Sequence, residues 1–152
     1  TEEAYDEVYE VNLKASMFLA QAAGKHQVAA GNGGKQVHLL SVRSQLGLRG
    51  RGYSAYCSTK GGQVMMIKQH AMELAPHGIT VNGVAPTFVF TGMIRHVMEN
   101  DEFRQGLLDR IPLGRIADPK DITGPALFFC APASGFVTGQ TMYVDGGITA
   151  SQ

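Results

Sequence analysis

The chain has 152 residues, which is enough for one domain with a buried core and too few for two ordinary domains. Its 13 basic residues balance its 13 acidic ones, so no charge excess indicates a nucleic-acid or membrane-surface partner. The two cysteines, Cys57 and Cys130, are too few for a disulfide framework, and no membrane-length apolar run or signal-peptide pattern is present, so a cytoplasmic location is expected.

A long amphipathic helix is expected at the start of the chain. Thr1 can cap it, with the acidic Glu2 and Glu3 in its first turn. Six apolar residues then recur at helical spacing, namely Val8, Val11, Ala15, Phe18, Leu19 and Ala22. Asn12 interrupts this pattern, and because asparagine is unfavourable inside a helix, it is either tolerated at the surface or kept for a polar task. A Gly-rich turn over residues 31–34 ends the helical region.

A short, mostly apolar strand is expected over residues 36–41, and it leaves Ser41 at its carboxyl end. That is the edge at which open α/β sheets place their chemistry. A loop rich in Gly and Arg follows over residues 42–53. It leads to a helix that Ser54 is expected to cap and that runs to about Ala75.

Tyr56 and Lys60 lie four residues apart on this expected helix, so both side chains rise from one face. A cation near a tyrosine favours the phenolate and lowers the phenol pKa from its usual value of about 10. Such a tyrosine can exchange a proton with a carbonyl oxygen near neutral pH. An isolated Tyr-x-x-x-Lys is more often a solvated helix face, so the meaning of the pair depends on its surroundings.

Two further strands are expected, over residues 79–85 and 140–144. Pro86 ends the first of them, and residues 87–115 form an excursion wide enough to be a binding lid. Pro119 takes the first position of another helix. Because strands alternate with helices throughout, the sequence predicts a parallel sheet.

The lid carries charges of both signs. Its basic members are Arg95, His96, Arg104, Arg110 and Arg115, and its acidic members are Glu99, Asp101, Glu102 and Asp109. These charges favour an anionic substrate only slightly.

Together these features resemble the short-chain dehydrogenase/reductase family. The matching elements, in chain order, are Asn12, a serine at a strand end, Tyr56-x-x-x-Lys60, the strand over 79–82 that runs into Pro86, and the stretch over 137–147 that ends in Asp145-Gly146-Gly147. Their order and spacing match from the first helix to the last strand. Within the family, the text is most similar to sugar-acid or polyol dehydrogenases and to 3-oxoacyl-carrier-protein reductases.

The resemblance implies hydride transfer between NAD or NADP and a secondary alcohol or ketone, without a metal. Tyr56 would be the catalytic acid/base, and Lys60 would lower its pKa and hold the nicotinamide ribose. A serine would bind the substrate oxygen, and Asn12 would anchor a water in a proton relay toward Lys60. The implied cofactor contacts are Tyr56, Lys60, Pro86, Val89 through its backbone, and Thr91.

Two positions depart from the family pattern. The family's serine would fall at position 43, which is Arg43 here. Ser41 and Ser44 flank it, and Ser41 is the favoured candidate because it lies where the strand ends. Thr87 replaces the usual glycine after Pro86, and its β-branched side chain restricts the backbone of the nicotinamide pocket.

The family's Gly-rich turn, which seats a pyrophosphate at a helix N-terminus, does not occur in this sequence. The expected fold is therefore the C-terminal part of a Rossmann-like, doubly wound parallel α/β sheet, with the first nucleotide-binding strands absent. Residues 1–152 would be the catalytic portion of one domain and would form a dimer or tetramer when full length. The substrate and the choice between NAD and NADP stay open. An alternative is a catalytically silent fragment or interaction module that associates with full-length paralogues.

A serine hydrolase is a third hypothesis. Ser54 lies in Gly52-Tyr53-Ser54-Ala55-Tyr56, which approaches a nucleophile elbow, but Tyr56 stands where the second glycine belongs. A helix cap explains Ser54 better. The five histidines have no metal-ligand spacing and the two cysteines are far apart, so no metal site is expected.

Overall fold

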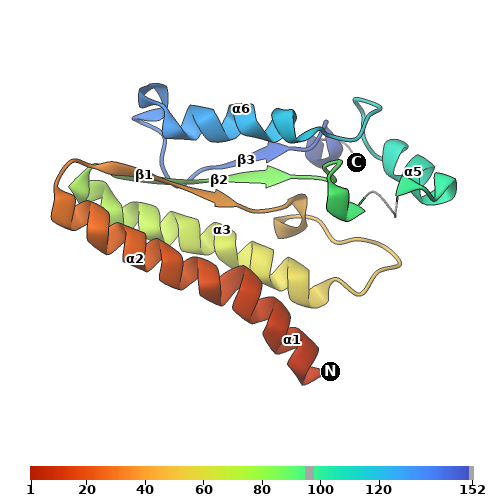
Figure 1. Cartoon of the computed structure of the whole chain (residues 1–152), viewed down its shortest axis with the longest axis horizontal. Helices are drawn as coiled ribbons and strands as arrows, with labels where there is room; N and C mark the ends of the chain where they lie inside the picture. The colour runs from red at the N-terminus through yellow and green to blue at the C-terminus, as the bar shows by residue number, and fades with distance from the viewer. Residues whose placement is uncertain (95–97, 151–152) are drawn as a thin grey trace.

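The protein has three layers, shown in Figure 1 as a computed structural model that describes residues 1–94 and 98–150. A three-stranded sheet forms the central layer, with α1, α2 and α3 on one face and α6 on the other. These helices span Glu2–Tyr9, Ala15–Ala30, Ser54–Leu74 and Pro119–Cys130, respectively. Arg95 and His96 of the lid lie outside the described residues.

The sheet contains β1 (Gly34–Leu39), β2 (Ile79–Pro86) and β3 (Thr141–Val144), in the order β1-β2-β3. Both neighbouring pairs are parallel, with Gly34 opposite Ile79 and Gly83 opposite Thr141. The predicted parallel sheet is therefore confirmed. All three strands end toward the same edge, so the segments that follow them meet there.

The first helical region is one continuous helix with a π-helical turn near its middle. Thr1 Oγ1 accepts a hydrogen bond from the Ala4 N–H at 3.4 Å, as expected of a cap. A π-helical turn over Glu10–Lys14 joins α1 to α2 and contains Asn12. Gly31 ends α2 with a φ of 70°, in the left-handed region that glycine adopts without strain.

The helix that carries Tyr56 starts one residue away from the predicted cap. Tyr53 takes the cap position without a side-chain hydrogen bond, and Ser54 is the first residue of α3. The prediction that Ser54 caps this helix is therefore wrong. Near its middle, α3 comes close to the π-helical turn, because a Cβ on Gly62 would lie 3.0 Å from Leu13 Cδ2.

The excursion after β2 contains α5 (Asp101–Leu108), which Asn100 caps by accepting a 2.8 Å hydrogen bond from the Phe103 N–H. The next helix, α6, begins with a capping box between Asp118 and Asp121 and has Pro119 in its first turn, as predicted. The long excursion thus returns to the sheet through a helix with a well-defined start.

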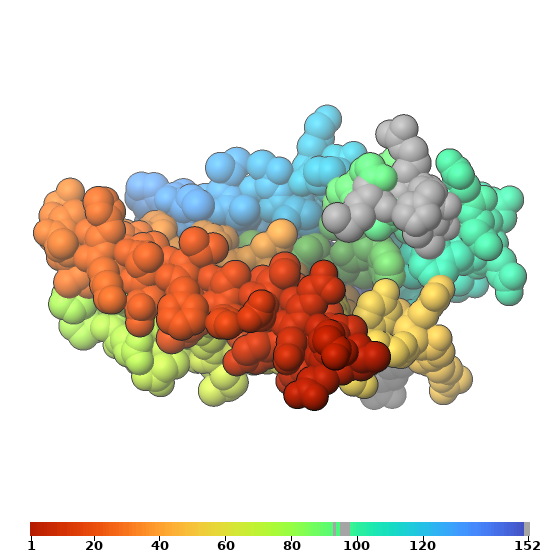
Figure 2. All heavy atoms as spheres, turned by 60° about the horizontal axis from the view of Figure 1, so that its bottom comes forward, coloured from red at the N-terminus to blue at the C-terminus, as the bar shows by residue number. Residues whose placement is uncertain are grey.

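The core lies between the sheet and α3. Its buried members are Leu40, Ile67, Ala71, Ile79, Val81 and Ala85. Outside this core, large apolar side chains remain exposed at the end of β1, on α2 and in the π-helical turn, namely Leu39 (62% exposed), Leu19 (72%) and Val11 (67%). Figure 2 shows α1 and α2 as an open surface along much of the molecule. Within the described residues, β1 pairs with β2 alone.

Candidate active site

A cavity of about 470 Å³ opens at the carboxyl ends of β1 and β2. The segments that follow these two strands form its walls, together with the first turn of α3. The lining includes Ser41, Arg43, Leu48, Tyr56, Phe88 and Val89. Five of the predicted site residues, Ser41, Tyr56, Pro86, Val89 and Thr91, therefore border one space, whereas Lys60 and Asn12 are not among its lining residues.

Ser41 and Tyr56 both border this cavity, and Ser41 Oγ accepts a 3.1 Å hydrogen bond from the Arg43 N–H. Burial raises the pKa of Tyr56, and a hydrogen bond with Ser41 opposes that rise. Ser44 faces elsewhere, because its Oγ donates to the Ser41 carbonyl at 2.7 Å and lies 3.1 Å from the Tyr143 hydroxyl. Of the two candidate serines, Ser41 is the one that the structure places beside Tyr56.

Lys60 lies next to Tyr56, but its charge does not set the tyrosine pKa. Its Nζ is 5.7 Å from the centre of the Tyr56 ring and donates a 3.0 Å hydrogen bond to the Leu39 carbonyl. Burial lowers the pKa of Lys60 and raises that of Tyr56. The prediction of a lowered tyrosine pKa is therefore wrong for the chain as it stands, because desolvation outweighs nearby positive charge.

Asn12 lies in the π-helical turn of the first helical region, whereas Tyr56 lies on α3. The Asn12 side chain forms a hydrogen bond within its own helix. Its amide donates to the Val8 carbonyl at 3.0 Å within the helix. Its backbone carbonyl accepts hydrogen bonds from Gln63 Nε2 at 2.6 Å and Ser16 Oγ at 2.9 Å. Within the described residues, no hydrogen bond joins Asn12 to Lys60 directly, and Gln63 is the side chain that links α3 to Asn12.

Sequence reasoning missed Gln63, although a signal existed. Gln63 lies three residues after Lys60, so it rises from the same face of α3 as the lysine. It is only 2% exposed, and glutamine is rarely so buried without a specific partner. The sequence thus showed that Gln63 shares the face of Lys60, whereas its burial and its link to the first helical region came from the structure.

The segment after Pro86 presents backbone groups at the cavity wall. An isolated parallel bridge joins Val89 to Ala117. Its hydrogen bonds run from the Phe90 N–H to the Ala117 carbonyl at 2.8 Å and from the Ala117 N–H to the Phe88 carbonyl at 3.3 Å. The N–H and C=O of Val89 take no part in this bridge, and neither group has a hydrogen-bond partner among the described residues.

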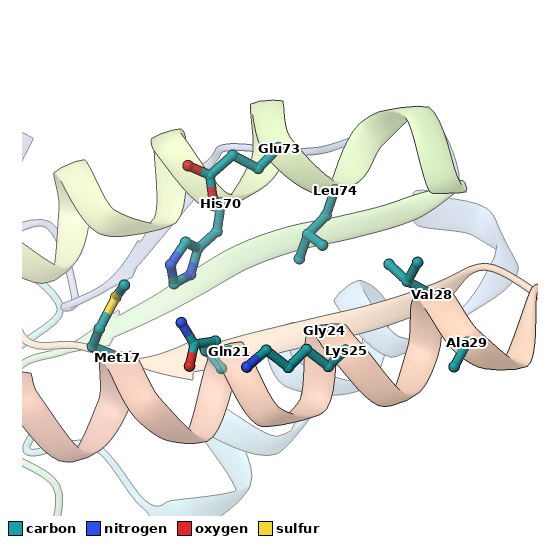
Figure 3. Close-up of a pocket in the computed structure, with 10 residues that line it drawn as sticks. Met17, Gln21, Gly24, Lys25, Val28, Ala29, His70, Glu73 and Leu74 are labelled. Carbon is teal, nitrogen blue, oxygen red and sulfur yellow. The ribbon is translucent and has the colours of Figure 1, made fainter.

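A second cavity, of about 390 Å³, lies between α2 and α3 and is shown in Figure 3. His70 is 6% exposed and projects into it, with Gln21 and Lys25 of α2 on the opposite side. None of the predicted catalytic residues borders this cavity. It is separate from the Ser41–Tyr56 site.

Two features of the part of the chain that the structure describes concern other function classes. No group of three or more His, Cys, Asp or Glu side chains there could hold a metal ion. No helix among the described residues has the length and apolar character needed to cross a membrane.

Comparison with known proteins assigns the family. The family model described as enoyl-(acyl carrier protein) reductase matches residues 1–149. The chain is 41% identical to an uncharacterized oxidoreductase of Mycobacterium tuberculosis, with 97% of this chain and 56% of that protein covered. It is 40% identical to L-xylulose reductase of Bos taurus, with 99% and 61% covered. It is also 38% identical to 2-dehydro-3-deoxy-D-gluconate 5-dehydrogenase of Escherichia coli, with 97% and 57% covered.

Solved structures agree with this assignment. A gluconate 5-dehydrogenase from Burkholderia cenocepacia, in complex with NADP and tartrate, matches with a TM-score of 0.94 and 34% identity. The match covers 100% of this chain and 58% of that one. The chain therefore belongs to the short-chain dehydrogenase/reductase family of oxidoreductases. It spans 56 to 61% of the length of the three relatives described above.

Proposed function

We propose that this chain is the catalytic portion of an NAD(P)-dependent oxidoreductase that interconverts a secondary alcohol and a ketone. The observation that carries the proposal is that Ser41 and Tyr56 border one cavity at the carboxyl edge of a parallel sheet. Lys60 lies against the same tyrosine ring. Relatives that include an L-xylulose reductase and an NADP-bound gluconate 5-dehydrogenase support the cofactor class and a sugar-type substrate.

The proton transfer follows from the protonation state of Tyr56. Because burial raises its pKa, the phenol carries its proton at neutral pH and can give it to a ketone oxygen as that oxygen gains charge. In the reverse direction, the phenolate takes the proton of the alcohol. Ser41 holds the substrate oxygen by a hydrogen bond, so that the oxygen faces Tyr56. The nicotinamide, when bound, supplies or accepts the hydride.

The cavity wall suits the carboxamide end of such a cofactor. A carboxamide has an N–H donor and a C=O acceptor, and the free Val89 backbone groups offer the complementary pair. Thr91 and Pro86 border the same space. Lys60, buried beside the Tyr56 ring, would bind ribose hydroxyls of the cofactor.

We further infer that residues 1–152 form the C-terminal part of a single Rossmann-type domain, whose first strands would pair with β1. The free edge of β1 and the exposed Leu39, Leu19 and Val11 support this inference, because a parallel sheet normally has both faces and its central strands covered. Exposed Met65 (61%) and Met72 (62%) on α3 are candidates for burial in a homo-oligomer. The presence of Ser41 beside Tyr56 disfavours the alternative of a silent interaction module.

The proposal is tested with Tyr56→Phe in the full-length enzyme. Turnover of sugar acids and polyols with NAD⁺ and NADP⁺ is followed by the absorbance of the reduced nicotinamide. Loss of the proton donor should lower kcat by about 100- to 10,000-fold. Cofactor affinity, measured by fluorescence titration, should stay close to wild type. Undiminished turnover would exclude Tyr56 as the acid/base and with it the proposed mechanism.

A further inference from the structure

Arg43 is a buried cation at the cavity that Ser41 and Tyr56 border, called the site cavity below. It lies in the 3₁₀ turn Val42–Ser44 after β1, is 6% exposed, and borders the same cavity as Tyr56. Its Nη1 donates to the Leu46 and Gly47 carbonyls at 3.2 and 2.6 Å. These two bonds fix one end of a guanidinium that has five N–H donors. Its Nε and Nη2 donate no hydrogen bond to any described residue.

No carboxylate balances this charge within the described residues. The ion pairs found there are Lys14–Glu10, Arg104–Asp101 and Arg115–Asp121. Burial lowers the pKa of Arg43, and the charge of Arg110 lowers it further. An arginine that is buried and repelled by a second arginine is costly unless an anion joins them.

Arg110 belongs to a neighbouring cavity of about 410 Å³, which shares Leu48 and Phe88 with the site cavity. This 410 Å³ cavity is lined by three arginines, Arg49, Arg51 and Arg110, and Glu102 is its single acidic lining residue among those described. Arg51 is held over the Phe103 ring at 5.6 Å. Positive charge is therefore concentrated on the side of the site cavity that faces the excursion after β2.

We propose that Arg43 and Arg110 form an anion subsite beside Tyr56, and that the substrate is a small hydroxy acid or oxo acid whose carboxylate binds there. This inference rests on the proposed function, because it places the carboxylate relative to the reacting carbon. The planar guanidinium of Arg43 has the fork geometry that fits a carboxylate, and its remaining donors are free. Bound there, the carboxylate supplies the missing countercharge and leaves the hydroxyl-bearing carbon near Ser41 and Tyr56.

The reaction in the oxidative direction is balanced on this arrangement. The secondary alcohol of the hydroxy acid loses its O–H proton to the Tyr56 phenolate, which becomes the neutral phenol, and its carbinol hydride to NAD(P)⁺, which gives the oxo acid. The carboxylate takes no part in the bond changes. Its role is to orient the substrate, so its loss should weaken binding more than it slows the chemical step.

The test compares gluconate with glucitol, which has the same carbon chain without the carboxylate, as substrates of the full-length enzyme. The wild type should use gluconate with a kcat/KM about 10- to 100-fold above that for glucitol, as expected for one charge-assisted contact. Arg110→Gln, at an exposed position, should raise the KM for gluconate about 10-fold and leave the values for glucitol unchanged. Arg43→Gln should raise the KM for gluconate more strongly than Arg110→Gln does, and Arg43→Lys should restore part of the affinity.

Arg104→Gln is the matched control, because Arg104 is exposed and already paired with Asp101. It should leave the kinetics of both compounds unchanged. Equal or better use of glucitol by the wild type, or equal losses for both compounds in Arg110→Gln, would overturn the anion subsite. Turnover that persists in Tyr56→Phe would instead overturn the proposed function.

Calorimetric titration of gluconate into the NADP-loaded Tyr56→Phe enzyme separates the subsite from the chemistry. Saturable binding that Arg110→Gln weakens supports the subsite even if neither compound is turned over. Absence of saturable gluconate binding would overturn it.

Discussion

Gln63 of α3 donates a 2.6 Å hydrogen bond to the backbone carbonyl of Asn12, in the π-helical turn that joins α1 to α2. A π-helical turn shifts backbone hydrogen bonds by one residue, so that a carbonyl inside a helix can accept from outside. Here the Gln63 amide uses that carbonyl and also donates to Ser16 Oγ at 2.7 Å. The π-helical winding at Asn12 thus exposes the carbonyl to which the buried Gln63 donates, and this hydrogen bond joins the two helices.

Gln63→Ala should destabilise the protein by about 1–3 kcal/mol, because it removes both hydrogen bonds and leaves a cavity at a 2% exposed position. Urea unfolding of the full-length enzyme measures the loss. The control is Gln69→Ala, since Gln69 is exposed and bonds only to Glu73 of the next turn. Similar effects of the two substitutions would show that the link to Asn12 contributes no more than a surface contact.

The choice between Ser41 and Ser44 is open to a direct test. Ser41→Ala should lower kcat by about 100-fold, because it removes the hydroxyl that orients the substrate oxygen beside Tyr56. Ser44→Ala should keep kcat close to wild type and lose only the contacts with the Ser41 carbonyl and Tyr143. Steady-state kinetics of the two variants decides the matter, and a larger loss in Ser44→Ala would reverse the assignment.

Ser54→Ala separates the oxidoreductase from the serine hydrolase hypothesis. Ser54 is exposed and makes no capping hydrogen bond, so its replacement should leave both stability and hydride transfer nearly unchanged. Ester hydrolysis by the wild type that disappears in this variant would support a nucleophilic serine. Thermal unfolding and nicotinamide absorbance, measured on the same preparation, give both readouts.

Sequence patterns predicted most of the fold, because its elements depend on local signals. The alternation of strands and helices predicted the parallel sheet, and Pro119 predicted the first turn of α6. The four-residue spacing of Tyr56 and Lys60 gave their shared helix face. Side-chain periodicity cannot separate a π-helical turn from an α-helix, so the winding change at Asn12 followed only from the tertiary contact with Gln63.

The site was less predictable, because its properties depend on burial and loop length. The loop between β1 and α3 decides which serine meets Tyr56, and serine spacing alone left Ser41 and Ser44 both open. The tyrosine pKa depends on desolvation, which the sequence does not specify. Arg43 stood out in the sequence only as a departure from the family pattern, whereas its unpaired charge at the cavity became visible only in three dimensions.

His38 should make stability dependent on pH in the acidic range. Burial lowers its pKa to about 4, with smaller contributions from the charges of His70 and Lys60. In the unfolded chain the pKa of His38 is near 6.5. Between pH 6.5 and about 4, His38 is therefore protonated in the unfolded chain and neutral in the folded one. Stability is therefore fully present above pH 6.5 and falls below it, by at most about 1.4 kcal/mol per pH unit from this residue.

His38→Asn removes this titration and should flatten the difference in unfolding free energy between pH 7 and pH 5, measured with urea on the full-length enzyme. His77→Asn, at an exposed turn position, is the control and should keep the wild-type dependence. An unchanged slope in His38→Asn would mean that His38 is hydrated enough to protonate in the folded state.

The chain of residues 1–152 should neither bind NADH or NADPH with measurable saturation nor stay monomeric on its own. The sequence has no Gly-rich turn to seat a pyrophosphate, and the β1 edge together with exposed Leu19 leaves apolar surface to associate. Fluorescence titration, thermal unfolding and sedimentation of this chain test both expectations. Leu19→Lys should reduce association without creating cofactor binding. Saturable binding with a raised Tm would show that these residues alone build a dinucleotide site, and would contradict the inference that further strands complete the domain.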